Sequence, residues 1–367
     1  MSAYRTIVAR LTFKDSPGDQ AAVLLATYDF THANKLFCFN LVTLPAADKG
    51  EEQPFASFVS LTSYMLQHAH LSQRTTLYCH LNLMVFRLLV EDPVLCKRLC
   101  SEESRTSVRL CRQRSPYLPL PTSGTGGATS GPRGAERVMA AAVMDTMIDA
   151  INHNLRRRLD VGLYTLCVGI LLRIISYMSR SRTRLAYHWA DLFRSLLSLV
   201  RFLTTYASDL KDLMHIDTLL DHVVNLLALG LSAGETFLPT PAAYDDLFYK
   251  VVETGEVLVK FRDTYKLANR PSNSIDTLVN VSTHYKEMLA ADRSNGEKGK
   301  GAPVKKSSQL TSLQVAEVIK QGYETLSIQA KEGLDSWEKY READERTLLK
   351  KMARAAVGDV SRGLVAE

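Results

Sequence analysis

The chain has 367 residues, of which 46% are hydrophobic and 23% charged, and its formal net charge is +6. This composition excludes a chain that is disordered throughout, because it provides ample apolar material for a core. A charge this small for the length does not identify a partner. The first 20 residues lack the long apolar run of a secretory signal, so no such signal is expected.

Apolar residues recur at three- and four-residue steps along most of the chain, a spacing that predicts amphipathic helices. The expected helices cover residues 20–43, 55–70, 73–91, 101–112, 136–153, 160–179, 185–207, 210–230, 242–267, 274–291, 313–326 and 333–356. No segment alternates with a period of two between turn residues, so strands are expected at most at residues 5–13. The sequence therefore predicts an all-α fold.

Two polar stretches interrupt the helical pattern and divide the chain. The expected parts are an N-terminal helical block (1–114), a flexible Pro/Gly/Ser/Thr insertion (115–134), a central helical solenoid (135–291), a polar linker (292–309), a C-terminal helical pair (310–358) and a tail (359–367). The C-terminal pair is too short for a large core of its own, so we expect it to dock on the central solenoid. Many helices of similar length joined by short loops indicate an armadillo-like helical solenoid of stacked helix pairs.

No linear motif for catalysis, nucleotide binding or zinc-dependent hydrolysis occurs in the sequence. Cys96, Cys100 and Cys111 lack the further cysteines or paired histidines that would complete a zinc site. His215 and His222 lie two helical turns apart, too far to share one small ion easily. We therefore expect no enzyme, cofactor or metal site. The six cysteines lie in apolar, helix-like stretches, which suits the reduced thiols of a cytoplasmic protein.

The strongest local charge bias lies in residues 154–201, which hold nine arginines, no lysine and two acids, a local charge of +7. One interpretation is a membrane-spanning helix through 161–178, although Arg173 interrupts its apolar run. Another is a basic surface for anionic lipid or an acidic partner. The third is a set of internal contacts between helices. The candidate surface residues are Arg156, Arg157, Arg158, Arg180, Arg182 and Arg184. No motif indicates nucleic-acid binding.

The stretch GETFLPTPAAYDDLFY at 234–249 predicts a sharp corner between two helices. The prolines should end the incoming helix near Gly230–Gly234, with Thr240 as the N-cap of the next helix and Pro241 in its first turn. Pro239 is expected to pack on Tyr244. Residues 235–256 hold five acids and one lysine, so the corner can also serve as an acidic, aromatic docking edge or pair with the arginines internally. The candidate edge residues are Phe237, Leu238, Tyr244, Asp245 and Asp246.

Long runs of the sequence resemble the C-terminal domain of the armadillo-like helical domain-containing protein 3 family. The resemblance is carried by residues 151–210, beginning INHNLRRRLDVGLYTLCVG, and by GETFLPTPAAYDDLFYKVV. It continues through LVEDP (89–93), RLCRQRSPYLPL (109–120) and QVAEVIKQGYETLSIQAKEGLDSWEKY (314–340). It covers most of the chain from about residue 55 onward, and its motifs are not catalytic ones.

The resemblance implies a non-enzymatic cytoplasmic scaffold that is recruited to Golgi membranes. Related proteins bind a type III phosphatidylinositol 4-kinase and support Golgi maintenance and secretion, and some fungal relatives are labelled membrane proteins on hydropathy alone. The family members are longer at the N-terminus, with further helical repeats. The expected function is therefore that of an adaptor with a protein partner and, through the arginines, an anionic membrane surface. The alternative is an integral membrane protein spanning through 161–178.

Overall fold

A computed structural model describes residues 17–46, 52–111, 136–154, 159–297 and 337–366. The chain divides into two compact units, the first formed by Met1–Tyr177 with Trp337–Glu367 and the second by Met178–Ser336. The division falls inside one helix, α8 (Val161–Ser181). The predicted insertion at 115–134 and most of the linker at 292–309 lie outside the described residues, so the predicted domain boundaries stay predictions.

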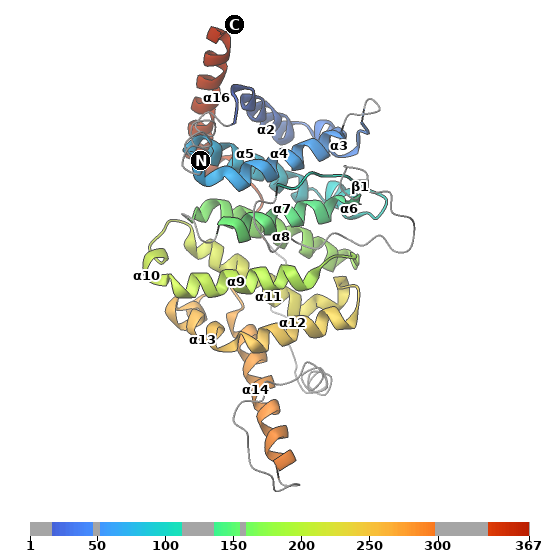
Figure 1. Cartoon of the computed structure of the whole chain (residues 1–367), viewed down its shortest axis with the longest axis vertical. Helices are drawn as coiled ribbons and strands as arrows, with labels where there is room; N and C mark the ends of the chain where they lie inside the picture. Colours follow the sequence, from blue (N-terminus) through green and yellow to red (C-terminus); the bar gives the residue numbers. More distant parts are fainter. Residues whose placement is uncertain (1–16, 47–51, 112–135, 155–158, 298–336, 367) are drawn as a thin grey trace, which may run out of the picture. The chain divides into compact units, whose positions relative to one another are not determined.

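Fourteen α-helices and one two-stranded ladder form within the described residues, which confirms the all-α prediction (Figure 1). The elements of the first unit are η1 (Asp19–Ala22), α2 (Val23–Ala33), α3 (Lys35–Thr43), α4 (Pro54–His68), η2 (Ala69–Leu71), α5 (Gln73–Glu91), α6 (Pro93–Cys100), β1 (Arg105–Thr106), β2 (Arg137–Val138), α7 (Met139–Asn154), most of α8, η4 (Glu342–Glu345) and α16 (Arg346–Ala366).

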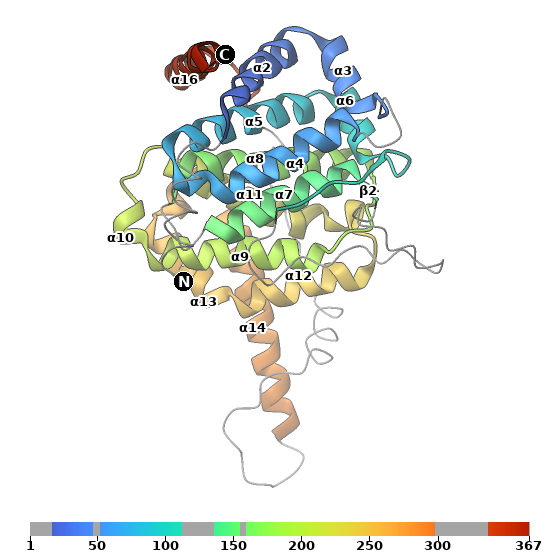
Figure 2. The same ribbon diagram turned by 45° about the horizontal axis from the view of Figure 1, so that its top comes forward.

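Helix α4 packs against both α5 and α7, and α2 packs against α5 (Figure 2). Phe86 of α5 lies at the centre of this packing, with ring centroids 6.3 Å from Phe55 and 5.0 Å from Phe58 on α4. All three rings are buried. Edge-to-face and tilted aromatic contacts of this kind add to the stabilisation from buried apolar area.

The predicted helix at 101–112 is wrong. Helix α6 begins earlier, at Pro93, because the Asp92 side chain caps its N-terminus by accepting from Val94 and Leu95. After Ser101 the backbone is extended, and β1 pairs with β2 in an antiparallel ladder that the sequence did not predict. The following residues continue along α4, where backbone N–H groups at 109 and 111 donate to serine hydroxyls.

The C-terminal helix α16 packs on η1, α2 and α5. Residues 310–336 lie outside the described part of the chain, so the predicted docking of the C-terminal pair on the central solenoid stays a prediction. Its anchor is Asp359, which is 1% exposed and accepts hydrogen bonds from Arg74 Nε at 2.8 Å and Tyr78 Oη at 2.6 Å. Burial, together with the Asp359 hydrogen bond, raises the pKa of Tyr78. Both donors to Asp359 lie on α5, so these hydrogen bonds favour the packing of α16 at this position on α5. The helix predicted at 333–356 instead begins at Arg346 and continues to Ala366.

The second unit continues from the end of α8 through α9 (Trp189–Thr205), α10 (Ala207–Leu210), α11 (Ile216–Phe237), α12 (Pro241–Glu253), α13 (Gly255–Thr264), η3 (Leu267–Asn269) and α14 (Ile275–Glu297). Helix α9 packs on α12 and α13, and α14 packs on α11, α12 and α13. The single helix predicted at 242–267 is two helices that meet at Thr254. The break brings Gly255 so close to Ser282 of α14 that a Cβ atom at 255 would overlap the serine hydroxyl.

Candidate functional site

A charge cluster, buried at Arg173 and half-buried at its other members, holds residues 337–341 against α5 and α8 in the first unit. We call it the Glu91 clamp, and it consists of Arg87, Glu91, Arg173, Trp337 and Tyr340. Arg87 Nε and Arg173 Nε donate to the same Glu91 oxygen at 2.9 and 2.8 Å. The other Glu91 oxygen accepts from the Tyr340 backbone N–H at 2.8 Å. One carboxylate therefore joins two helices to a C-terminal segment.

Both arginines of the Glu91 clamp also bind the segment directly. Arg87 Nη2 and Arg173 Nη2 donate to the Glu338 carbonyl, at 3.1 and 3.2 Å. The Arg87 guanidinium lies over the Tyr340 ring and that of Arg173 over the Trp337 ring, at 5.3 and 5.4 Å from the centroids. Burial and the neighbouring Arg87 charge lower the pKa of Arg173 to about 10, so it stays charged at neutral pH.

The clamp explains why an arginine stands in the middle of the apolar helix α8. Two helices within the described residues, α8 and α11, are long and apolar enough to cross a membrane. Of the apolar 18-residue stretch in each helix, 78% and 61% are buried inside the structure. A buried core helix of a protein without a membrane span can have the same length and hydropathy. Arg173 is 3% exposed and paired with Glu91. The internal-contact interpretation therefore describes this arginine.

The predicted basic surface is described at one end of α8 only, because Arg156, Arg157 and Arg158 lie outside the described residues. At the other end Arg180, Arg182 and Arg184 are exposed, and we call them the arginine edge. Arg182 has a φ of 52°, in the left-handed region. Its N–H donates to the Ser179 carbonyl and that of Thr183 to the Met178 carbonyl, a Schellman ending in which glycine usually takes the left-handed position.

The arginine edge and the predicted corner meet inside the second unit. Arg184 Nη2 donates to the Glu235 carbonyl in the last turn of α11, at 3.0 Å. Thr236 Oγ1 donates to Ser179 Oγ at 3.2 Å. The C-terminal ends of α8 and α11 therefore lie together, and arginine charge is favourable beside the partial negative charge of helix C-termini. The two segments that the sequence singled out separately form one surface region.

The aromatic part of the predicted docking edge is not available at the surface. Phe237 and Leu238 are buried, and the centroid of the Phe237 ring lies 5.3 Å from that of the Trp189 ring. Tyr244 is also buried, donates from Oη to the Leu231 carbonyl, and covers Gly234, where a Cβ atom would clash with its ring. These side chains hold the corner together, which corrects their assignment as partner contacts.

The backbone of the corner agrees with the sequence in part. Thr240 is the N-cap of α12, with its Oγ1 accepting from the Ala243 N–H at 3.3 Å, and Pro241 opens the helix, as predicted. The predicted end of the incoming helix near Gly230–Gly234 is wrong. Helix α11 continues to Phe237, because Gly234 is required by the close approach of Tyr244 and the chain becomes extended only at Leu238, before Pro239.

Asp245 and Asp246 are half-buried on α12. Asp246 forms an ion pair with Lys250 one turn later. Among the described residues, no group of three or more His, Cys, Asp or Glu side chains is arranged to hold a metal ion. The six cysteines are free thiols, and all except the half-buried Cys111 are buried.

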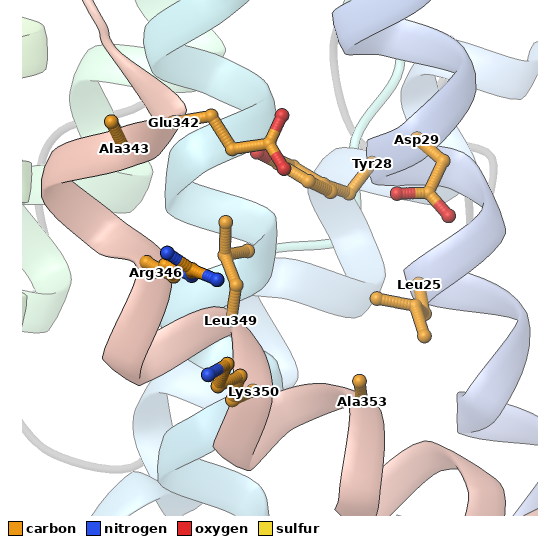
Figure 3. A pocket seen from close by; sticks show the side chains of 9 residues that line it. All are labelled: Leu25, Tyr28, Asp29, Glu342, Ala343, Arg346, Leu349, Lys350 and Ala353. Atoms are coloured by element: carbon orange, nitrogen blue, oxygen red, sulfur yellow. The ribbon is translucent and has the colours of Figure 1, made fainter.

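An open groove lies between α2 and the η4/α16 segment of the first unit (Figure 3). Its volume is about 410 Å³, and Leu25 and Tyr28 of α2 face Leu349 and Ala353 of α16 across it. Asp29 and Glu342 lie at one end, and Arg346 and Lys350 line the α16 side. Burial, together with the Glu342 charge, raises the pKa of Asp29. Sequence reasoning missed this groove, because it is made from opposite ends of the chain.

Comparison with known proteins identifies the family. The family described as "Armadillo-like helical domain-containing protein 3, C-terminal" matches residues 137–362. The proteins of that name from Xenopus laevis and Homo sapiens are 31% and 30% identical over 225 and 234 residues, which are 60% and 62% of this chain. A Schizosaccharomyces pombe protein described as a UPF0588 membrane protein is 27% identical over 74% of the chain. No solved structure matches.

The matched regions are 32%, 34% and 42% of the length of these three relatives, so the chain spans about a third to two fifths of the proteins that it resembles. The family match begins at β2 and ends within α16, so it includes helices of both units. Its name describes the helical architecture that the structure shows. The chain therefore belongs to the armadillo-like helical domain-containing protein 3 family and has its all-α, armadillo-like fold.

Proposed function

We propose that the protein is a non-enzymatic helical adaptor, recruited peripherally to Golgi membranes from the cytoplasm, that binds a type III phosphatidylinositol 4-kinase and supports Golgi maintenance and secretion. The observation that carries the binding role is the arginine edge. Three exposed arginines lie at the end of α8 or just after it. One of them, Arg182, occupies a left-handed position that glycine fills at lower conformational cost. Backbone strain retained at a surface site indicates that the side chain has a role of its own.

The chemistry of the arginine edge fits an acidic protein surface or anionic lipid headgroups. Guanidinium groups form bidentate hydrogen bonds with carboxylates and phosphates, and a fixed position reduces the entropy lost on binding. The link to Golgi membranes and to a lipid kinase comes from the family resemblance of the sequence. It is part of the proposal, because the chain spans only a part of its relatives.

The test is direct binding of the purified chain to a purified type III phosphatidylinositol 4-kinase. We expect Arg180→Glu/Arg182→Glu/Arg184→Glu to weaken the complex by about tenfold or more, as loss of a charged contact region does. Lys266→Gly is the matched control, because Lys266 is another cation with a left-handed backbone in the same unit. No kinase binding by the unmodified chain, or equal binding by the triple variant, contradicts the proposal.

The alternative is an integral membrane protein that spans through α8. It is favoured by the length and hydropathy of that helix and by the description of the Schizosaccharomyces pombe relative as a membrane protein. Carbonate extraction of cell membranes separates the two functions. An adaptor is released to the supernatant, whereas a spanning protein stays in the pellet.

A further inference from the structure

Helix α16 carries an apolar stripe that continues beyond the groove. Its members recur at steps of four, four, three and four residues, which places them on one face of the helix. They are Leu349, Ala353, Val357, Val360 and Leu364. The first two line the groove, and the last three are 63%, 51% and 70% exposed. A different face of α16, with Met352, Ala356 and Asp359, is buried.

The stripe is longer than a small molecule requires. From Ala353 to Leu364 a helix rises about 16 Å, which adds three turns of exposed apolar surface to the groove. Scattered exposed apolar side chains are ordinary, but a periodic stripe along one helix face that runs out of a groove marks an interaction site. The geometry fits a second helix lying along α16, with its first turns between α16 and α2.

The charges beside the stripe are almost all positive. Helix α16 carries five cations and one acid, and that acid, Asp359, is buried against Arg74 and Tyr78. Within the described part of the chain, Arg346, Lys350 and Arg354 form no ion pair. At the far end of the groove the sign changes, because Asp29 and Glu342 lie there (Figure 3). A ligand that matches this pattern has carboxylates along most of its length and a cation at one end.

We propose that the α2/α16 groove and its stripe bind an acidic amphipathic helix of a partner protein. Apolar residues of that helix at positions i, i+3 or i+4, and i+7 pack on the stripe, and its carboxylates lie beside Arg346, Lys350 and Arg354. A basic residue at one end pairs with Asp29 and Glu342. The concave shape and the two carboxylates disfavour the alternative of an anionic membrane, which is flat and repels acids. This site is distinct from the arginine edge and does not depend on the kinase.

The experiment uses the full chain and a fluorescent synthetic peptide of about 18 residues, with leucines at helical spacing, glutamates on the flanks and a lysine at one end. A second peptide has its glutamates replaced by lysines, and a third probe is a phosphatidylcholine vesicle containing phosphatidylserine. We expect the acidic peptide to bind at least about tenfold more tightly than its basic counterpart. Peptide binding should also slow hydrogen exchange in α2 and α16.

Two variants test the surface. Val357→Ser/Val360→Ser removes exposed apolar area, and Lys350→Glu/Arg354→Glu reverses the charge beside it; each should weaken acidic-peptide binding by about tenfold. Leu36→Ser is the matched control, since this exposed residue lies on α3, outside the groove. The proposal is overturned if the acidic peptide does not bind, if the basic peptide binds equally well, or if the double variants leave its binding unchanged. Vesicle binding that the same variants abolish, without peptide binding, assigns the surface to a membrane and also overturns it.

Discussion

A single backbone angle at Arg182 connects the stability of the second unit with the proposed binding role. An L-residue in the left-handed region costs about 1–2 kcal/mol relative to glycine, which adopts it freely. The charge of Arg182 contributes to binding at the surface, whereas its left-handed backbone lowers the stability of the folded unit. The two contributions can therefore be separated by substitution.

Replacement of Arg182 by glycine is expected to stabilise the second unit by about 1 kcal/mol, after allowance for the greater freedom of glycine in the unfolded chain. Urea unfolding measures this change, with Trp189 as the fluorescent reporter in a Trp337→Phe background, because each unit contains one of the two tryptophans. Arg180→Gly is the control: residue 180 lies inside α8, so glycine should destabilise there. Equal effects at both positions would rule out relief of strain.

Among the elements, α16 is the clearest case of a helix positioned by a few polar contacts. Its sequence pattern predicted a helix but not its neighbours, because Asp359 reaches Arg74 and Tyr78 across the chain. The corner at Thr240 was predictable, since a cap and a proline act on the residues beside them. The glycine at 255 was not, because the close contact that requires it is with Ser282 of another helix. Local chemistry was readable from the sequence, and contacts between distant segments were not.

Substitution of Asp359 by alanine leaves Arg74 and Tyr78 without their buried acceptor and is expected to cost about 3 kcal/mol. The loss should appear first as faster hydrogen exchange in α16, because few other polar contacts hold this helix. Exchange in α12, which belongs to the other unit, serves as the internal reference. If protection of α16 is unchanged, its anchoring lies elsewhere.

For the molecule as a whole, the sequence predicted the fold class and family but not the candidate binding groove. Regular helical spacing extends through most of the chain, and this is enough to assign an all-α fold. The groove needs α2 and α16 together, and Tyr28 and Tyr340, whose hydroxyls lie 2.6 Å apart beside it, are separated by 312 residues. The role of Arg173 was likewise open, because its partner Glu91 lies in another helix.

Arg173→Leu distinguishes a core helix from a membrane span by the sign of its effect. In the core it removes one partner of a buried ion pair and should destabilise the first unit by about 3 kcal/mol. In a membrane span, loss of a central arginine favours insertion by about 2.5–3.5 kcal/mol. Thermal unfolding without detergent and carbonate extraction measure the two effects. Arg173→Lys should destabilise the first unit less than Arg173→Leu does, since it keeps the charge but loses the planar hydrogen-bonding geometry.

The discontinuous first unit also fixes an order of events during synthesis. The second unit is one continuous stretch of chain, whereas the first needs residues 337–367 to supply α16 and the last two members of the Glu91 clamp. Domains generally fold as their residues leave the ribosome. The Glu91 clamp therefore cannot form when Glu91 and Arg173 are translated. It can form only after the whole second unit and then Trp337 and Tyr340 have been synthesised. A stop codon between residues 337 and 346 would leave the second unit intact and deprive the first unit of α16.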